Sequence, residues 1–307
     1  MIDVFAKRDH CPSCNAATAD AVPAVASRPP AESLTSSQLG PFLSGYTLRR
    51  VFFTYHRCGR CSTLYCPMYF NEEHLKCLYR NQPENMGEAP LGARVKTQEH
   101  YFQILQRHSH MRGGYLELGT DLGVFVDLCV RAGGFDHYWL YEPNEAVHDA
   151  LATRLGPHPY TLRRFYASGD VPEGSVSTAV MIHVLDHVLD PRHLLRAIFK
   201  TLEPGGVLFV VTHDAESLLA RTFGRRWPPY TLQHPQLFGR RSIRRLMEDV
   251  GFNGVEVVKT LNHFPLSHLA KALCSVFGLR SGLIPDLTSP MLGIRLGNIA
   301  TIARRPA

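Results

Sequence analysis

The sequence predicts an α/β fold in which a doubly wound, mostly parallel sheet follows a small cysteine-rich domain. From residue 114 onward, strand-like and helix-like stretches alternate with short connections, and this pattern is typical of parallel sheets covered by helices on both faces. Residues 1–80 hold six of the eight cysteines. We therefore expect a domain at residues 1–80, a linker at residues 81–96 and an α/β domain at residues 97–307.

The expected strands are apolar runs, seven in number, at residues 115–118, 138–142, 161–166, 178–184, 207–212, 254–261 and 298–305. The expected helices lie at residues 124–132, 145–155, 191–202, 242–252 and 266–279. In the third of these helices, leucine, isoleucine and phenylalanine repeat at helical spacing. Asp190 can cap this helix and Pro191 suits its first turn, while Ser242 is the expected cap of the fourth.

Bulk composition is that of an ordinary globular protein of 307 residues, with 45% hydrophobic and 20% charged residues. No apolar run reaches the roughly 20 residues needed to cross a bilayer, and the N-terminal stretch lacks the apolar core of a secretory signal. We therefore expect a cytoplasmic protein without a membrane partner. The net charge of +6 is spread along the chain, which weakens a nucleic-acid interpretation without excluding it. The oligomeric state is not encoded in any recognisable pattern.

Residues 115–126, YLELGTDLGVFV, run from a strand-like stretch through a glycine-bearing turn into a helix-like stretch. A second strand-like stretch ends at Glu142, 25 residues after Glu117. Glycine lets a ligand approach the backbone closely, and an acidic residue ending the second strand can accept both hydroxyls of a ribose. This layout predicts a nucleotide-type cofactor site. A dinucleotide dehydrogenase is the nearest competitor, but the turn lacks G-x-G-x-x-G.

Four motifs in order make residues from about 100 to 307 resemble class I S-adenosylmethionine-dependent methyltransferases. They are the glycine turn after Glu117, the acid Glu142, the run HVLDHVLDP from residue 183, and LEPGGVLFVVTHD from residue 202. The third motif is close to the HVLEHV pattern of one subgroup. The resemblance implies a seven-stranded Rossmann-like sheet and S-adenosylmethionine as the cofactor.

The resemblance also implies roles for individual residues. Glu142 is expected to bind the ribose hydroxyls, and His183 to lie under the cofactor and support the turn. The remaining expected cofactor-binding residues are Glu117, Gly119, Thr120, Asp121, Gly123 and Pro143. Asp121 departs from the family, which has a glycine there. Its carboxylate could pair with the ammonium of the cofactor, point outward and only shape the turn, or block the site.

Methyl transfer to a hydroxyl or an acidic carbon needs a base that takes a proton. His187 is the first candidate, because it follows the fourth strand, where ligands gather in such sheets, and imidazole titrates near neutral pH. Asp186 and Asp190 could orient it. The alternative is that His187 packs against the cofactor or caps a turn. His213 and His234 are weaker candidates for the base.

Two C-x-x-C pairs, Cys11 with Cys14 and Cys58 with Cys61, are separated by 43 residues. Four thiolates can close a tetrahedral zinc site, which leaves no open position for catalysis. We therefore expect a structural zinc ion in a zinc-ribbon-like domain. The alternatives are a vestigial site and a redox pair. His10, His56 and Cys66 are substitute ligands.

A zinc ribbon before such a methyltransferase domain resembles two groups, one acting on sugars and other small metabolites and one acting on ribosomal RNA. Weak charge asymmetry favours the first group, so we expect methyl transfer to an oxygen or carbon of a small sugar-like or natural-product acceptor. The alternatives are an RNA methyltransferase that grips RNA with the ribbon, and a non-enzymatic zinc-bearing interaction protein with a degenerate cofactor site.

Overall fold

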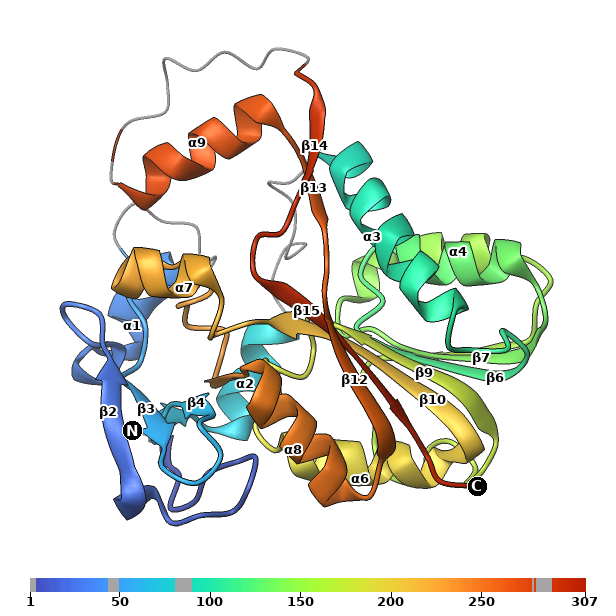
Figure 1. The fold of residues 1–307 in the computed structure, drawn as a ribbon, viewed down its shortest axis with the longest axis horizontal. Coiled ribbons are helices and arrows are strands. Elements are labelled where there is room, and N and C mark those ends of the chain that lie inside the picture. The colour runs from blue at the N-terminus through green and yellow to red at the C-terminus, as the bar shows by residue number, and fades with distance from the viewer. Residues whose placement is uncertain (1–3, 44–49, 81–89, 278, 280–288) are drawn as a thin grey trace.

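The computed structural model describes residues 4–43, 50–80, 90–277, 279 and 289–307. Among these residues the largest sheet has seven strands, and it lies beside the N-terminal part of the chain (Figure 1). The strand order is β12-β15-β10-β9-β6-β7-β8. Only β15 in this sheet runs antiparallel to its neighbours β10 and β12. The strands are β6 (Gly113–Leu118), β7 (Phe135–Tyr141), β8 (Tyr160–Arg163), β9 (Val176–Ile182), β10 (Leu202–His213), β12 (Asn253–Lys259) and β15 (Asn298–Arg304). The predicted doubly wound, mostly parallel sheet is confirmed.

Helices cover both faces of this sheet (Figure 1). The helices α3 (Leu91–Gln106), α4 (Val124–Ala132) and α5 (His148–Leu155) pack on one face, against side chains such as Val180 and Phe209. On the other face α6 (Pro191–Thr201) and α8 (Arg240–Val250) pack against Ala179 and Leu208. Neighbouring residues of one strand thus point into opposite cores, because successive side chains of a strand alternate between the two faces of the sheet. A strand buried on both sides reads as a continuous apolar run.

The predicted helix starts are partly confirmed. The Asp190 side chain accepts a hydrogen bond from the His193 backbone 2.8 Å away, so it caps α6, with Pro191 in the first turn. Ser242 is not the cap of α8, which begins two residues earlier, at Arg240, after Gly239. Its hydroxyl instead accepts a hydrogen bond from the Gly239 backbone at 2.9 Å, so Ser242 stabilises the first turn from inside the helix.

The N-terminal part of the chain builds two small sheets. One contains β2 (Ala21–Val25), β3 (Tyr55–Cys58) and β4 (Leu64–Tyr65), and the other pairs β1 (Phe5–Lys7) with β5 (Met68–Phe70). Its helices are α1 (Ser36–Leu39) and α2 (Glu72–Arg80), with short 3-10 turns at Thr18–Asp20, Ala31–Ser33 and Gly40–Phe42. Residues 81–89 of the predicted linker lie outside the described residues, and α3 already begins at Leu91.

The N-terminal part is joined to the larger domain by a shared sheet and a shared core. The strand β11 (Gln236–Leu237) adds to β4, although more than 170 residues separate them in sequence. Trp227, Tyr230 and Leu232 pack into the same core as Phe52 and Phe53. The two parts therefore meet through buried apolar surface, and the 227–238 segment belongs structurally to both.

An arm extends from the sheet, and its helix lies above α7 (Leu218–Phe223) in the view of Figure 1. It consists of α9 (Leu266–Val276) and the paired strands β13 (Asn262–Pro265) and β14 (Met291–Ile294). Two further 3-10 turns lie at Glu145–Val147 and Gly224–Arg226. Among the helices of the described residues, none combines the length and apolarity needed to cross a membrane.

Candidate active site and metal centre

The turn after β6 requires glycine at two positions. Gly119 has a φ of +72°, and a Cβ there would lie 2.5 Å from Cγ2 of Val184. Gly123 also has a φ of +72°, and its Cβ would lie 2.5 Å from Leu151. Thr120, between them, is buried. The turn therefore lies directly against Val184, in the segment that follows β9, and both close packing and backbone conformation require glycine at these two positions.

Glu142 follows β7 and faces the same turn. Its Oε2 accepts a hydrogen bond from the Asp121 backbone at 2.8 Å, and its Oε1 accepts one from Asn144 at 2.9 Å. Asp121 reaches this position with a φ of +48°, a left-handed conformation that aspartate tolerates better than most residues. Burial raises the pKa of Glu142, partly offset by these two hydrogen bonds. Pro143, next in the chain, is half-buried.

The Asp121 side chain approaches an arginine from another element. Its carboxylate lies 3.6 Å from Nη1 of Arg94, which is on α3 and only 10% exposed. The turn and α3 therefore place a carboxylate and a guanidinium side by side. Sequence reasoning missed Arg94 because it lies 27 residues before Asp121, within an ordinary helix that only tertiary packing brings to the turn.

Glu117 lies beneath the turn and is 1% exposed. The Tyr115 hydroxyl donates a hydrogen bond to its Oε2 at 2.6 Å. Burial, together with the nearby carboxylates of Glu142 and Asp121, raises the pKa of Glu117 to about 8. Glu117 is therefore mostly protonated at neutral pH, which spares this region a further negative charge beside Glu142 and Asp121.

Four histidines gather around one buried carboxylate where β9 and β10 end. The Asp186 carboxylate is fully buried, and its Oδ2 lies 3.9 Å from Nε2 of His213. The rings of His183 and His213 are 4.5 Å apart, and Asn298 contacts a nitrogen of each, at 3.2 Å and 3.0 Å. His183, with a φ of +53°, turns the chain out of the sheet.

The second pair of histidines, His187 and His234, has a defined proton arrangement. Nδ1 of His234 lies 2.6 Å from the Pro229 carbonyl, which can only accept, so this nitrogen carries the proton. Nε2 of a neutral His234 therefore accepts, and the donor is Nε2–H of His187 at 3.1 Å. In neutral His187 the unprotonated nitrogen is then Nδ1.

Burial decides the charge of this cluster. It lowers the pKa of His187 to about 3, with a further contribution from His234, and it lowers the pKa of His213 as well. Burial alone would raise the pKa of Asp186, but the four surrounding histidines outweigh it and lower that pKa. At neutral pH His187 is therefore in the form that can accept a proton, although a weakly basic one.

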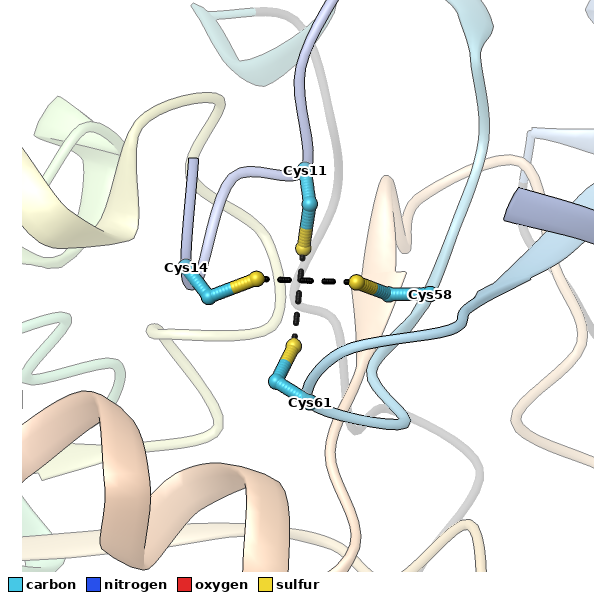
Figure 2. A group of neighbouring side chains, drawn as sticks. All are labelled: Cys11, Cys14, Cys58 and Cys61. Carbon is cyan, nitrogen blue, oxygen red and sulfur yellow. Dashed lines mark hydrogen bonds between the residues drawn. The ribbon is translucent and has the colours of Figure 1, made fainter. Parts of the chain in front are cut away.

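The four predicted cysteine ligands come together (Figure 2). Sγ of Cys11 lies 3.6 Å from Sγ of Cys61, and Sγ of Cys14 lies 3.5 Å from Sγ of Cys58. Disulfide sulfurs are about 2.05 Å apart, so neither of these two sulfur–sulfur contacts is a disulfide bond. Ligands about 2.3 Å from a tetrahedral zinc ion are about 3.8 Å apart, so the four buried sulfurs fit zinc. His10, His56 and Cys66 are not in this group, as far as the described residues show.

The two cysteine pairs have the same backbone turn. Asn15 and Ser62, which directly follow the second cysteine of each pair, both have positive φ, at 59° and 64°. Each donates its backbone N–H to the carbonyl of the first cysteine, Cys11 or Cys58, at 2.9 Å and 3.0 Å. This repeated turn points both sulfurs of a pair toward the same centre.

A family model described as "Methyltransferase domain" matches residues 94–257, which include the glycine turn, Glu142, Asp186 and the four histidines around it. The chain belongs to this methyltransferase family. Solved structures of S-adenosylmethionine-dependent methyltransferases share its fold. A methyltransferase of this class from Thermotoga maritima matches 76% of this chain and all of its own, with a TM-score of 0.51 and 16% identity. The YcgJ protein of Bacillus subtilis matches 68% of this chain and 99% of its own, with a TM-score of 0.50 and 12% identity.

A curated relative, the ubiquinone biosynthesis O-methyltransferase of Caulobacter vibrioides, is 31% identical over 109 residues. The match covers 33% of this chain and 42% of that enzyme. This chain thus spans less than half of the relative's length.

Proposed function

We propose that the protein transfers the methyl group of S-adenosylmethionine to an oxygen or carbon of a small sugar-like or natural-product acceptor. One observation carries the proposal: the glycine turn, Glu142 and the histidine cluster around buried Asp186 follow the carboxyl ends of β6, β7, β9 and β10. Ligands of doubly wound sheets bind at this edge. The O-methyltransferase named above acts in ubiquinone biosynthesis, which supports a small acceptor.

The cofactor, when bound, supplies a methyl group already activated by a positively charged sulfur. Glu142 is proposed to accept hydrogen bonds from the ribose hydroxyls in place of those from Asp121 and Asn144. Gly119, Thr120 and Gly123 are proposed to border its methionine part. We propose that Asp121 binds the ammonium of that part and Arg94 its carboxylate. His183 and Val184 support the turn from the opposite side.

The protein's own chemical task is to hold the acceptor in line and to remove a proton from it. We propose His187 as the base, with Nδ1 as the accepting atom. Its proton on Nε2 stays on the hydrogen bond to His234. The carboxylate of Asp186 is close enough to the cluster to stabilise the positive charge that His187 gains on accepting the proton.

For the N-terminal part we propose a zinc-ribbon-like domain of residues 1–80 that binds one structural zinc ion through its four cysteines. The four cysteines are buried, and their sulfurs lie close together. A buried thiolate without a cation is therefore costly, and a zinc ion would remove that cost. The bound ion would hold together an element with a small core of its own.

The test is methyl transfer with His187→Ala and, as a matched control, His193→Ala on the exposed side of α6. We expect His187→Ala to lower kcat at least about 100-fold with little change in cofactor affinity, and His193→Ala to resemble the wild type. Full activity of His187→Ala would exclude this base. If calorimetry detects no binding of S-adenosylmethionine to the metal-loaded protein, the proposed methyl transfer is refuted. If the protein binds RNA with a steep salt dependence, an RNA acceptor is favoured instead.

A further inference from the structure

The 227–238 segment, which carries His234, is fixed by the N-terminal part through its own backbone. The Tyr69 hydroxyl donates to the Leu232 carbonyl at 2.5 Å, and the Tyr55 hydroxyl donates to the carbonyl of His234 at 2.6 Å. The backbone N–H of Cys66 donates to the Pro235 carbonyl at 2.9 Å. Three of four consecutive carbonyls thus bind residues that lie more than 160 positions earlier, and all three donors are buried.

Aromatic packing adds to these hydrogen bonds. The Tyr230 ring stacks on Phe52 with centroids 5.2 Å apart and lies at the same distance from Tyr55. Trp227 packs edge-on against Tyr230 and is 1% exposed. These rings therefore belong to the core of the N-terminal part.

The same segment also forms hydrogen bonds with the turn that carries His187. The Gln236 side chain is fully buried and donates from its amide nitrogen to the Leu185 carbonyl at 3.0 Å and to the Val188 carbonyl at 2.6 Å. These carbonyls flank His187 on both sides. Arg8, which directly follows β1, adds a contact from the N-terminal part, because it donates to the Leu189 carbonyl at 3.3 Å.

Only a few residues connect the cysteine cluster to His187. The ring of Tyr65 packs among the four cysteines, and Tyr65 is the β partner of Gln236 in the β4–β11 pair. Gln236 then holds the turn, and His234, two residues earlier, accepts the hydrogen bond from His187. The cysteine cluster is therefore linked to the proposed base through two residues of the 227–238 segment.

We infer that the N-terminal cysteine domain acts as a brace that positions His187, and that Tyr55, His234 and Gln236 are its positioning residues. The inference rests on the proposed function, since it assigns the brace to the proposed base. It explains why a domain with a closed metal site shares a sheet and a core with the methyltransferase domain. Loss of the brace should impair the acceptor step and spare cofactor binding, because Glu142 and the glycine turn make none of these contacts.

The experiment compares Tyr55→Phe with Tyr65→Phe in the metal-loaded protein of 307 residues. Both changes remove one hydroxyl from the same domain, but the Tyr65 hydroxyl binds Thr18 rather than the 227–238 segment. Loss of one buried hydrogen bond predicts a fall in kcat of about fivefold to tenfold for Tyr55→Phe, with cofactor affinity within about twofold of wild type. Tyr65→Phe keeps the ring beside the cysteines and the backbone pairing with Gln236, so it should keep the wild-type kcat.

A second measurement does not depend on activity. Nitrogen-15 NMR of labelled histidines reports which ring nitrogen carries the proton, and the wild type should show His187 protonated at Nε2 and His234 at Nδ1. In Tyr55→Phe and in Gln236→Leu, the signals of both residues should shift or broaden, while those of His193 stay unchanged. If both variants fold and keep wild-type histidine signals and kcat, the inference is overturned. If the signals change but no acceptor is ever methylated, the brace stands and the proposed function fails.

Discussion

The protonated state of Glu117 predicts a pH dependence of the free energy of unfolding, which can be measured without a substrate. An isolated glutamic acid has a pKa near 4.5, whereas in the folded protein burial raises the pKa of Glu117 to about 8. Between these values the folded state keeps a proton that the unfolded state has lost. Unfolding therefore releases a proton in this window, and the free energy of unfolding falls as the pH rises from about 4.5 to 8.

Linkage gives the size of this effect. With the two pKa values above, the ionisation of Glu117 lowers the free energy of unfolding by about 3 kcal/mol more at pH 8.0 than at pH 5.5. Glu117→Gln keeps an acceptor for the Tyr115 hydroxyl and cannot ionise. The variant should thus gain about 3 kcal/mol relative to wild type over this pH range.

Urea unfolding of both proteins at pH 5.5 and pH 8.0, without cofactor and at equal metal content, measures this difference. Taking the difference between the two proteins cancels the titrating groups that do not interact with Glu117. Glu203→Gln, at an exposed position of β10, is the control and should show no such change. A stability difference between wild type and Glu117→Gln that stays constant within about 0.5 kcal/mol across the two pH values would refute the buried, protonated state.

Three further predictions concern the turn and the metal centre. Glu142→Ala should weaken S-adenosylmethionine binding at least about tenfold by calorimetry. The control is Glu145→Ala, which removes a neighbouring acid paired with Arg164 and should leave the affinity unchanged. Equal affinities of the two variants would exclude the ribose role of Glu142. Gly119→Ala should cost about 2 kcal/mol more in urea unfolding than Gly205→Ala, because both have positive φ but only the first Cβ meets a neighbour, and equal losses would disprove the clash. Cys58→Ser should abolish binding of about one zinc ion per chain and lower the melting temperature, while the exposed Cys77→Ser should retain the metal; zinc retained by Cys58→Ser would contradict the four-thiolate site.

Strands were easier to predict than their ends. The run 207–212 was predicted as a strand, and β10 spans Leu202–His213, because apolar continuity marks the buried middle of a strand but not its exposed extension. At residues 161–166 the prediction extended too far, since β8 ends at Arg163 at the sheet edge, where pairing on one side gives little reason to continue. Edge strands carry a weak periodic signal because they bury less surface.

Local patterns in the sequence were enough to predict the α/β class, the succession of strands and helices, the glycine turn with its acid, and the two cysteine pairs. Each of these leaves a local signature, either a period of side chains or a short spacing fixed by backbone geometry. Only the folded chain shows that Arg94 meets Asp121, that Asp186 lies among four histidines, and that β11 joins the N-terminal sheet. The first and last of these contacts join residues 27 and more than 170 positions apart. They depend on how the chain packs, and no local pattern records that.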